Sequence, residues 1–373
     1  MDDARLLLVS VTDPAAPPGG RELLYRVNRA VLEELFGDRF RLFRPDGAQA
    51  TSIGGAMRGY IDGIDANSLS RLCDVIEAER VTRVFLDGSN FGIAARVIKR
   101  RFPRVRVFTF FHNFEARFFW GSLKVRRSAR AAAVLLANYL AERAAARWSD
   151  VRICLSERDG AGLRRWYGRG ADAIAPMVLA DKLPPGPPPA RADRVKPYAL
   201  FVGGAFYANV EGMRWWAREV APRSPLRTVV IGQGMEVLAD ELAGNAQVEL
   251  VGGVDDLAPW YRDAAVVIAP IFDGSGMKTK VAEALMFGKR VIGTPEAFSG
   301  YAPEVVETGR LCADAEAFLG AMTEALSPDI PAFDPVLRAL YDRLHSPDAG
   351  RARLASILGV PNSSEAARQR SSA

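Results

Sequence analysis

Residues 265–285, AVVIAPIFDGSGMKTKVAEAL, join a strand to a helix through a loop that contains two glycines. The unbroken apolar run Ala265–Ala269 is typical of a strand that is buried on both faces of a sheet. Lys278–Phe287 then repeats its apolar residues with the period of a helix. A strand of this kind needs helices on both faces, so the stretch predicts an α/β fold built on a parallel sheet.

The loop and the first turns of this helix carry charges that helix stability does not explain. Gly274 and Gly276 let a phosphate approach the backbone, and Ser275 can cap the helix. Lys278 opposes the helix dipole unless a polyanion binds there. Glu283 lies about 7–8 Å further along the helix, at ~1.5 Å per residue. That spacing suits a diphosphate at the loop and a ribose diol at the carboxylate, so we expect a nucleotide diphosphate here.

Lys280 is the second lysine of this turn. At about 100° per residue it lies roughly 200° around the helix from Lys278, so we do not expect it to share the phosphate. A simpler alternative is an exposed i,i+3 pair between Lys280 and Glu283, with Lys278 in solvent.

The alternation of apolar strands and helices occurs on both sides of a proline-rich segment, which we interpret as a linker. It predicts two Rossmann-like domains that face each other across a cleft, with ligands at the carboxyl ends of the strands. The expected parts are an N-terminal domain at 1–182, the linker at 183–197, a C-terminal domain at 198–335, a helical segment at 336–360 that crosses back, and a disordered tail at 361–373. The expected strands are Leu6–Val11, Phe40–Phe43, Val84–Leu86, Val105–Phe110, Val151–Leu155, Ala199–Val202, Thr228–Ile231, Val248–Val251, Ala265–Ala269 and Arg290–Gly293. The expected helices include Glu22–Phe36, Leu69–Glu79, Ile93–Arg101, Val125–Trp148, Val210–Val220 and Lys278–Phe287.

Composition excludes several classes of protein. Among 373 residues there is no run of 18 or more apolar residues, which a transmembrane helix needs. The start, MDDARLLLVSVTD, has acidic residues where a signal peptide has basic ones. Three cysteines without metal or redox spacing suit a reducing compartment, so we expect a cytoplasmic protein. No dinucleotide-binding G-x-G-x-x-G opens the chain, and no motif indicates nucleic-acid binding.

Charge is distributed unevenly between the two halves. Residues 1–195 hold 32 Lys and Arg against 22 Asp and Glu, whereas residues 196–373 hold 17 against 22. A basic N-terminal half suits an anionic acceptor or an anionic membrane surface. A general bias toward arginine is the alternative explanation.

Two further glycine-bearing loops follow strands of the C-terminal half. FVGGAFYANVEG, residues 201–212, contains Gly203 and Gly204, and VIGQGMEVL, residues 230–238, contains Gly232. Because the carboxyl ends of parallel strands lie at one edge, we expect these loops and the opening loop to converge on one crevice.

The order and spacing of these motifs between about 199 and 301 resemble the donor domain of glycosyltransferase family 4, which has the GT-B fold. The resemblance implies a nucleotide-diphosphate-sugar donor, with Glu283 on the ribose and Lys278 on the diphosphate. It also implies that Gly203 and Gly204 lie beneath the phosphates, and that the loop around Val254 encloses the base.

The sequence departs from this family at two places. Eight residues before Glu283 the family commonly has an acid near the donor sugar, and this chain has Ser275. Where many members carry a basic residue for the diphosphate, this chain has Asn209 and, further on, Arg214.

The N-terminal half contributes candidate residues at three strand ends. Gly19 and Gly20 follow the first strand, where GT-B enzymes place a loop against the donor phosphates; a simple turn is equally consistent. His112 resembles the family's histidine that reaches toward the donor sugar, and Glu115 is a candidate base. The residues expected to line the acceptor pocket are Asp87, Asn90, Asn113 and Arg117.

Four basic residues, Lys124, Arg126, Arg127 and Arg130, follow an aromatic cluster that consists of Phe110, Phe111, Phe114, Phe118, Phe119 and Trp120. This combination suits the surface of an anionic membrane, where a lipid-linked acceptor would lie. A buried aromatic core with a solvated basic helix face is the alternative.

We expect no metal and no cofactor besides the nucleotide sugar as substrate. Asp255 and Asp256 are better interpreted as a helix cap than as a metal pair. The sequence thus predicts a metal-independent glycosyltransferase, retaining by resemblance, that acts on a saccharide or polyprenyl-linked acceptor in cell-surface polysaccharide or glycolipid synthesis. The alternatives are an epimerase or phosphorylase of the same fold, and a non-catalytic nucleotide-sugar-binding partner of another transferase.

Overall fold

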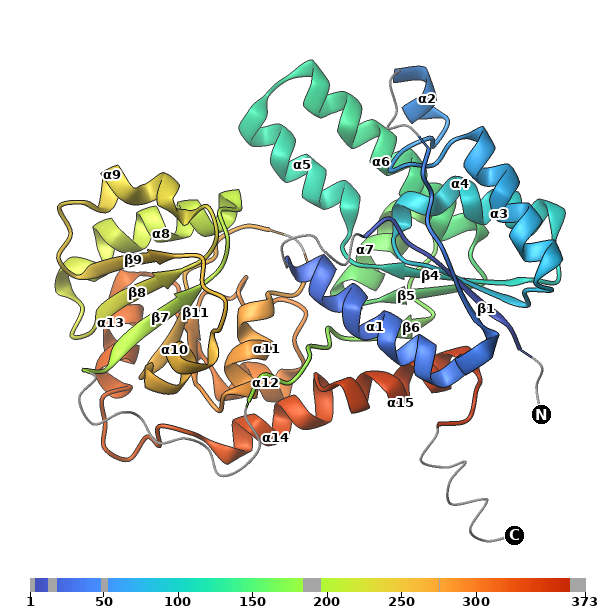
Figure 1. Cartoon of the computed structure of the whole chain (residues 1–373). Helices are drawn as coiled ribbons and strands as arrows, with labels where there is room; N and C mark the ends of the chain where they lie inside the picture. Colours follow the sequence, from blue (N-terminus) through green and yellow to red (C-terminus); the bar gives the residue numbers. More distant parts are fainter. Residues whose placement is uncertain (1–3, 13–18, 48–52, 184–195, 275, 363–373) are drawn as a thin grey trace, which may run out of the picture. The chain divides into compact units, whose positions relative to one another are not determined.

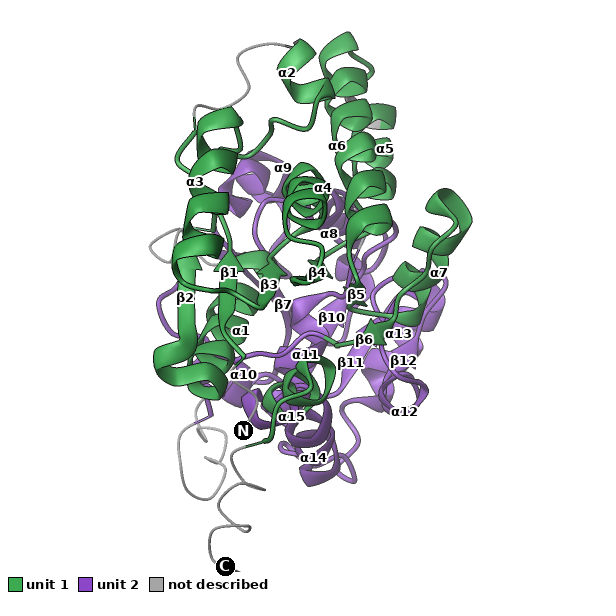
Figure 2. Ribbon diagram, turned by 90° about the vertical axis from the view of Figure 1, so that its right-hand side faces the viewer, with its two compact units in different colours: residues 1–176, 350–373 green, residues 177–349 purple. Residues whose placement is uncertain are grey.

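A computed structural model describes residues 4–12, 19–47, 53–183, 196–274 and 276–362. In this part of the chain, two six-stranded sheets of parallel strands are each flanked by helices (Figure 1). The chain divides into two compact units (Figure 2), the first formed by residues 1–176 with 350–373 and the second by residues 177–349. The predicted linker lies largely outside the described residues, as does the predicted tail.

The first unit has the strand order β2-β1-β3-β4-β5-β6. Two of its inner strands, β1 and β3, are buried along their whole length, as is typical of parallel strands that helices cover on both faces. Its strands are β1 Leu6–Val9, β2 Phe40–Phe43, β3 Arg83–Leu86, β4 Arg106–Phe111, β5 Val151–Cys154 and β6 Ala173–Ile174. Its helices are α1 Gly20–Phe36, α2 Ile53–Met57, α3 Ala66–Ala78, α4 Gly92–Arg101, α5 Glu115–Arg126, α6 Ala129–Trp148 and α7 Glu157–Tyr167, with 3₁₀ turns at Gly37–Arg39 and Ser89–Phe91.

The second unit has the strand order β12-β11-β10-β7-β8-β9. Its strands are β7 Tyr198–Val202, β8 Arg227–Ile231, β9 Val248–Gly252, β10 Val266–Ala269, β11 Val291–Gly293 and β12 Arg310–Leu311. Its helices are α8 Tyr207–Glu219, α9 Ala239–Leu242, α10 Ala258–Asp263, α11 Thr279–Met286, α12 Pro303–Thr308, α13 Ala315–Glu324 and α14 Pro335–Leu344, with 3₁₀ turns at Ala221–Arg223 and Met235–Leu238.

The strand order reverses direction at one point in each sheet. In the first unit the reversal lies between β1 and β3, and in the second between β7 and β10. Ligands of open parallel sheets bind outside the carboxyl ends of the strands at such a point. We therefore expect ligand sites at the loops that follow these four strands.

The C-terminal segment returns to the first unit. The helical stretch expected to cross back is two helices, α14 and α15 (Pro347–Leu358), separated where Pro347 begins the second. Nη1 of Arg351 in α15 lies 2.7 Å from the carboxylate of Glu34 in α1.

Every expected strand is present, with ends that differ by at most two residues. The two edge strands β6 and β12 were not predicted, because two residues cannot show an apolar run. The single helix expected at 125–148 is wrong. Arg127 adopts a left-handed conformation with φ of 42°, and Ser128 caps the new helix α6 by accepting a hydrogen bond from the backbone of Ala131.

Candidate functional site

The glycine loops of the second unit pack directly against one another. The backbone N–H of Gly203 donates to the carbonyl of Ile231, 2.8 Å away. A Cβ atom on Gly232 would lie 1.9 Å from the carbonyl oxygen of Gly203, so only glycine fits there. The loops after β7 and β8 therefore converge beside the reversal point of the sheet.

Lys280 projects from α11 into this junction. Its side chain is almost fully buried, and its Nζ donates to Oδ1 of Asn209 at 2.9 Å. The ammonium lies 4.8 Å from the centre of the Phe201 ring, and a Cβ atom on Gly203 would lie 3.3 Å from it. Burial, reinforced by repulsion from Lys278, lowers the pKa of Lys280 to about 7, against the attraction of Glu283.

This position corrects two expectations from the sequence. The estimate that Lys280 lies far around the helix from Lys278 fails because α11 begins at Thr279, and Lys278 is the residue before it, with extended backbone. The exposed pair between Lys280 and Glu283 is also wrong, since both side chains are buried and bind other groups.

Lys278 stands on the other side of the junction, at the start of α11. Its Nζ donates to the carbonyl of Gly276 at 2.9 Å and to the carboxylate of Glu296 at 3.2 Å. A Cβ atom on Gly274 would lie 3.7 Å from this ammonium. Lys278 holds the N-cap position of α11, and the predicted cap and donor contact of Ser275 both lie outside the described residues.

Glu283 lies further along α11 and is buried. Its Oε1 accepts from Nζ of Lys182 at 3.1 Å, and its Oε2 accepts from the hydroxyl of Tyr261 at 3.3 Å. The Tyr261 ring stacks on Phe287 with centres 4.6 Å apart. These partners hold the carboxylate in a fixed orientation. Val254, which was predicted to lie beside the nucleotide base, is half-buried in the loop after β9.

Other parts of the second unit are separate from the junction. Arg214 pairs with Glu211 and Glu241, so its charge is already engaged. Asp256 accepts from the backbone N–H of Ala258, the first residue of α10, at 2.8 Å, but Leu257 holds the N-cap position, so the cap interpretation of Asp255 and Asp256 is wrong.

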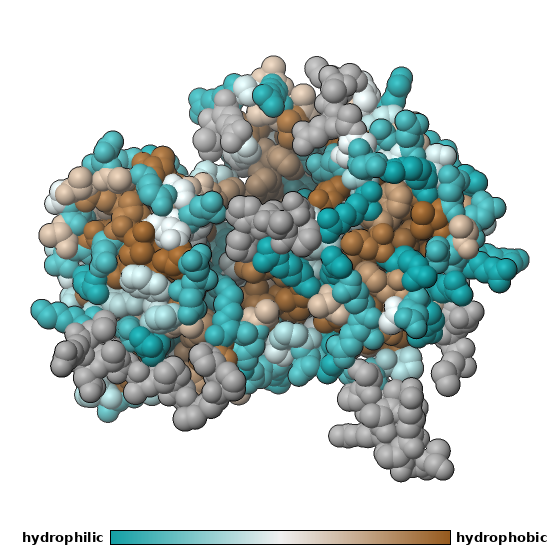
Figure 3. Space-filling model, viewed as in Figure 1, coloured by the Kyte–Doolittle hydropathy of each residue, from teal (hydrophilic) through white to brown (hydrophobic). Residues whose placement is uncertain are grey.

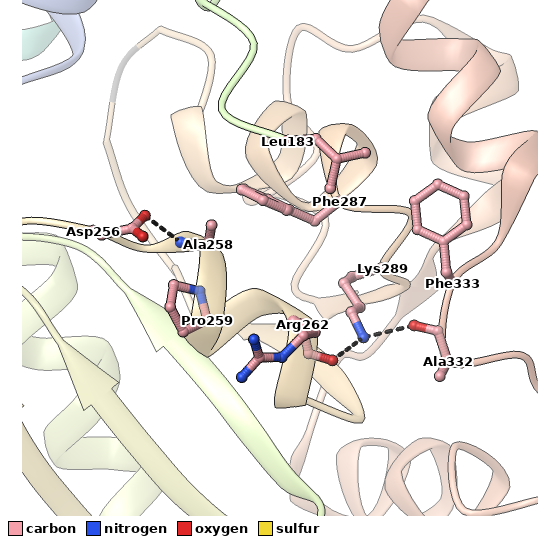
Figure 4. A pocket seen from close by; sticks show the side chains of 9 residues that line it. All are labelled: Leu183, Asp256, Ala258, Pro259, Arg262, Phe287, Lys289, Ala332 and Phe333. Carbon is pink, nitrogen blue, oxygen red and sulfur yellow. Dashed lines mark hydrogen bonds between the residues drawn. The ribbon is translucent and has the colours of Figure 1, made fainter. Parts of the chain in front are cut away.

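A cavity of about 250 Å³ lies beside α10 (Figure 4). Within it, Nζ of Lys289 donates to the carbonyls of Arg262, Ala264 and Ala332 at 2.9, 2.9 and 2.6 Å. None of the predicted donor residues lines this cavity. Its lining residues are Leu183, Asp256, Ala258, Pro259, Arg262, Phe287, Lys289, Ala332 and Phe333.

In the first unit, a buried hydrogen-bonded chain crosses the reversal point. Nε2 of His112, at the end of β4, lies 2.8 Å from Oδ1 of Asp87, and the hydroxyl of Ser10 donates to Oδ2 of Asp87 at 2.6 Å. Burial alone would raise the pKa of Asp87, but His112, Ser10 and Arg21 lower it overall. An ionised carboxylate only accepts, so Nε2 of His112 carries a proton, and its buried Nδ1 has no hydrogen-bond partner in the described residues. In the neutral imidazole this nitrogen is an acceptor.

Glu142 fixes the helix that follows His112. Its carboxyl group is fully buried and accepts from the backbone N–H groups of Glu115 and Ala116, both at 3.0 Å, and from the hydroxyl of Tyr167 at 2.8 Å. Burial, with the nearby charge of Glu115, raises the pKa of Glu142 to about 8. Burial likewise raises the pKa of Glu115 itself, although Arg21 and His112 act against this.

The other residues predicted for the acceptor pocket are Asn90, Asn113 and Arg117. Asn90 is buried and donates to Asp62 at 2.8 Å. Asn113 and Arg117 are half-buried on either side of Glu115 along the sequence.

The loop before α1 already has an internal partner. The N–H of Gly19 donates to the carboxylate of Glu22 at 3.1 Å, and Gly20 begins α1. Its predicted contact with donor phosphates therefore competes with a carboxylate of the chain itself.

Sequence reasoning did not identify Ser10, Arg21, Lys182 or Tyr261 as parts of these clusters, and it set Lys280 aside. Ser10 and Arg21 carry a local signal, since each adjoins the end of the first strand or the double glycine. Lys182 and Tyr261 carry none, because they reach Glu283 from distant positions in the chain.

Comparison with known proteins agrees with the geometry of the second unit. Residues 196–328 match the family model described as Glycosyl transferases group 1. This segment thus matches a group 1 glycosyltransferase domain, which supports a transferase enzyme. A comparison with curated proteins found no match.

The whole chain resembles solved structures. Sucrose-phosphate synthase from Thermosynechococcus elongatus is 19% identical with a TM-score of 0.67, over 95% of this chain and 98% of that chain. Anabaena Alr3699/HepE in complex with UDP is 12% identical with a TM-score of 0.64, over 95% and 99%. WaaG, a glycosyltransferase involved in lipopolysaccharide biosynthesis, is 16% identical with a TM-score of 0.58, over 94% of both chains. These likenesses confirm the predicted GT-B class of α/β fold.

Proposed function

We propose that this protein transfers a sugar from a nucleotide-diphosphate donor to a saccharide or lipid-linked acceptor. The observation that carries the proposal is the junction of glycine loops with the ammonium groups of Lys278 and Lys280 and the carboxylate of Glu283. Two cations beside exposed backbone suit a diphosphate, and an oriented carboxylate suits the two hydroxyls of a ribose. The Anabaena neighbour was crystallised with UDP and with UDP-glucose, which fits such a donor.

The chemistry follows from where charge develops. Departure of the diphosphate leaves negative charge beside Lys278, Lys280 and the first turn of α11, which stabilise it. In the acceptor-binding unit, Nδ1 of His112 can accept a hydrogen bond from a sugar hydroxyl. By family resemblance we propose a retaining, metal-independent reaction, in which the leaving phosphate takes the acceptor proton on the same face.

A screen of UDP-, GDP-, dTDP- and ADP-sugars by thermal unfolding tests the donor site. We expect the nucleotide sugars of one of these four bases to raise the unfolding temperature of the protein. A ligand at ~100 times its dissociation constant adds about 2.7 kcal/mol to the free energy of unfolding. Turnover to a glycosylated product separates a transferase from an epimerase, which releases an isomerised nucleotide sugar, and from a binding partner, which shows no turnover.

The same screen on Glu283→Ala tests ribose recognition. We expect the stabilisation by the matching nucleotide sugar to decrease, whereas Glu324→Ala, at an exposed ion pair of the same unit, should leave it unchanged. Stabilisation by none of the four nucleotides in folded wild-type protein would remove the donor-site proposal, and an unchanged affinity in Glu283→Ala would remove the ribose assignment.

We further propose that α5 and α6 contact an anionic membrane. Phe110, Phe111 and Phe114 are core residues, so part of the aromatic cluster is structural. Three large apolar residues of this hairpin are nevertheless exposed, beside exposed basic residues, and hydrophobic residues reach the surface there (Figure 3). The exposed apolar residues are Trp120, Val134 and Leu136, and the basic ones are Lys124, Arg127 and Arg130.

Vesicle flotation tests this contact. In the described residues no helix is long and apolar enough to cross a membrane. We expect binding to vesicles that contain phosphatidylserine, a weakening of several-fold for Trp120→Ser, and further loss as salt rises. Trp166→Ser, at an exposed tryptophan of α7, is the matched control. Equal binding to neutral and anionic vesicles, or none to either, would contradict the proposal.

A further inference from the structure

The guanidinium group of Arg21, in the first unit, has two N–H donor atoms without hydrogen-bond partners in the described residues. Arg21 is the second residue of α1 and lies at the reversal point, where a Cβ atom on Gly88 would be 3.5 Å from its Nη2. Both Nε and Nη2 are shielded from solvent, and neither has a hydrogen-bond partner among the described residues. Burying charged donors without partners costs free energy, so such groups usually have a ligand.

The two unpartnered atoms belong to the edge that arginines use for paired oxygens. Other arginines of the described residues show this geometry. Arg262 donates from Nε and Nη2 to the two oxygens of Asp263 at 2.7 and 2.8 Å, and Arg214 directs the same edge at Glu241. Arg21 presents that edge without a carboxylate.

The neighbouring carboxylates bind elsewhere. Asp87 accepts from His112 and Ser10, Asp62 accepts from Asn90, and Glu22 accepts from Gly19. Glu115 is close enough for Arg21 to lower its pKa against the effect of burial, yet no hydrogen bond joins the two. Among the described residues, therefore, no carboxylate supplies the oxygens that this edge fits.

A second unpartnered group lies in the same cluster. Nδ1 of His112 has no hydrogen-bond partner in the described residues, and His112 is only 6% exposed to solvent. Asp87 joins the two groups, because it binds His112 directly and precedes Gly88, which Arg21 approaches. A ligand that meets both would present an oxyanion to Arg21 and a hydroxyl to His112.

We infer that the acceptor carries a carboxylate or a phosphate whose oxygens bind Nε and Nη2 of Arg21. This inference rests on the proposed function, since it names the chemical class of that acceptor as an acidic saccharide or a sugar phosphate. Arginine suits this task better than lysine because its two parallel N–H groups match two oxygens.

The test uses the full chain labelled with ¹⁵N-arginine and titrated with glucuronate, glucose 6-phosphate, inorganic phosphate and glucose. The Nε–H signal of Arg21 is identified by its loss in Arg21→Lys. We expect glucuronate or glucose 6-phosphate to shift this signal to saturation and glucose to leave it unmoved. The probe that shifts the Arg21 signal to saturation shows whether the acceptor carries a carboxylate or a phosphate.

Arg21→Lys should bind that acidic sugar about 30-fold more weakly, since it keeps the charge and loses the paired donors. Arg29→Lys, at an ion pair with Glu33 on the same helix, is the matched control. A signal that no acidic probe moves, or equal affinity of wild type and Arg21→Lys, overturns the inference. Stabilisation by nucleotide sugars is measured in parallel, so a failure here with donor binding intact overturns this inference alone.

Discussion

Replacing Lys280 with methionine will weaken the binding of the matching nucleoside diphosphate by about 100-fold, as measured by isothermal titration calorimetry. Methionine keeps an unbranched stem against Phe201 and removes the ammonium beside Gly203. A hydrogen bond to a charged group contributes about 1.5–3 kcal/mol, and a factor of ten in affinity is about 1.4 kcal/mol. Lys280 should therefore account for much of the binding free energy of the diphosphate.

The same affinity should depend on pH in a defined direction. The pKa of Lys280 is lowered to about 7 in the folded protein, so above this pH the free protein has lost much of the charge. Binding a polyanion restores the ammonium, which means that binding takes up a proton and weakens as pH rises. We expect up to about a tenfold loss per pH unit above neutrality, and Lys280→Met should remove this dependence.

A control lysine separates this effect from general loss of charge. Lys99→Met removes an ion pair with Asp150 in the first unit and should leave affinity and its pH dependence unchanged. If Lys280→Met binds the diphosphate like the wild type at pH 7, the ammonium is structural and the donor role belongs to Lys278 alone.

The strands and the glycine loops that follow them could be predicted because their signals are local. Apolar runs such as Val266–Ala269 identify buried strands, and glycines beside them identify the loops. The direction of Lys280 could not be predicted, because it depends on a helix that begins one residue after Lys278. A displacement of one residue changes the direction of a side chain by about 100°.

The buried cluster of Asp87 and His112 shows a different limit of prediction from sequence. Asp87 and His112 were each placed at a strand end from the sequence, but as separate contacts with ligands. Their pairing depends on β3 and β4 being neighbours in register, with Leu86 opposite Thr109, and strand order is not a local property. The bond between them assigns Asp87 the task of positioning His112.

Asp87→Asn should accordingly reduce turnover at least about 100-fold and leave donor affinity unchanged. The asparagine amide can donate to Nε2, which would move the imidazole proton to Nδ1 and replace an acceptor by a donor at the side that meets the sugar hydroxyl. A similar exchange in the serine-protease triad costs about 10⁴-fold. Ser10→Ala removes only the hydrogen bond to Oδ2 and should reduce turnover by a few-fold.

Stability measurements separate positioning from folding. Because the folded protein lowers the pKa of Asp87, its ionised form stabilises the fold fully above the unfolded value of about 3.9, and this stabilisation is lost as pH falls through the folded value. The free energy of unfolding should therefore differ between wild type and Asp87→Asn at pH 7 and converge in acid. The turnover defect at pH 7 should persist where unfolding curves show the variant fully folded and a nucleotide sugar still stabilises it. If turnover instead follows the folded fraction of Asp87→Asn, then Asp87 supports the fold and does not position His112.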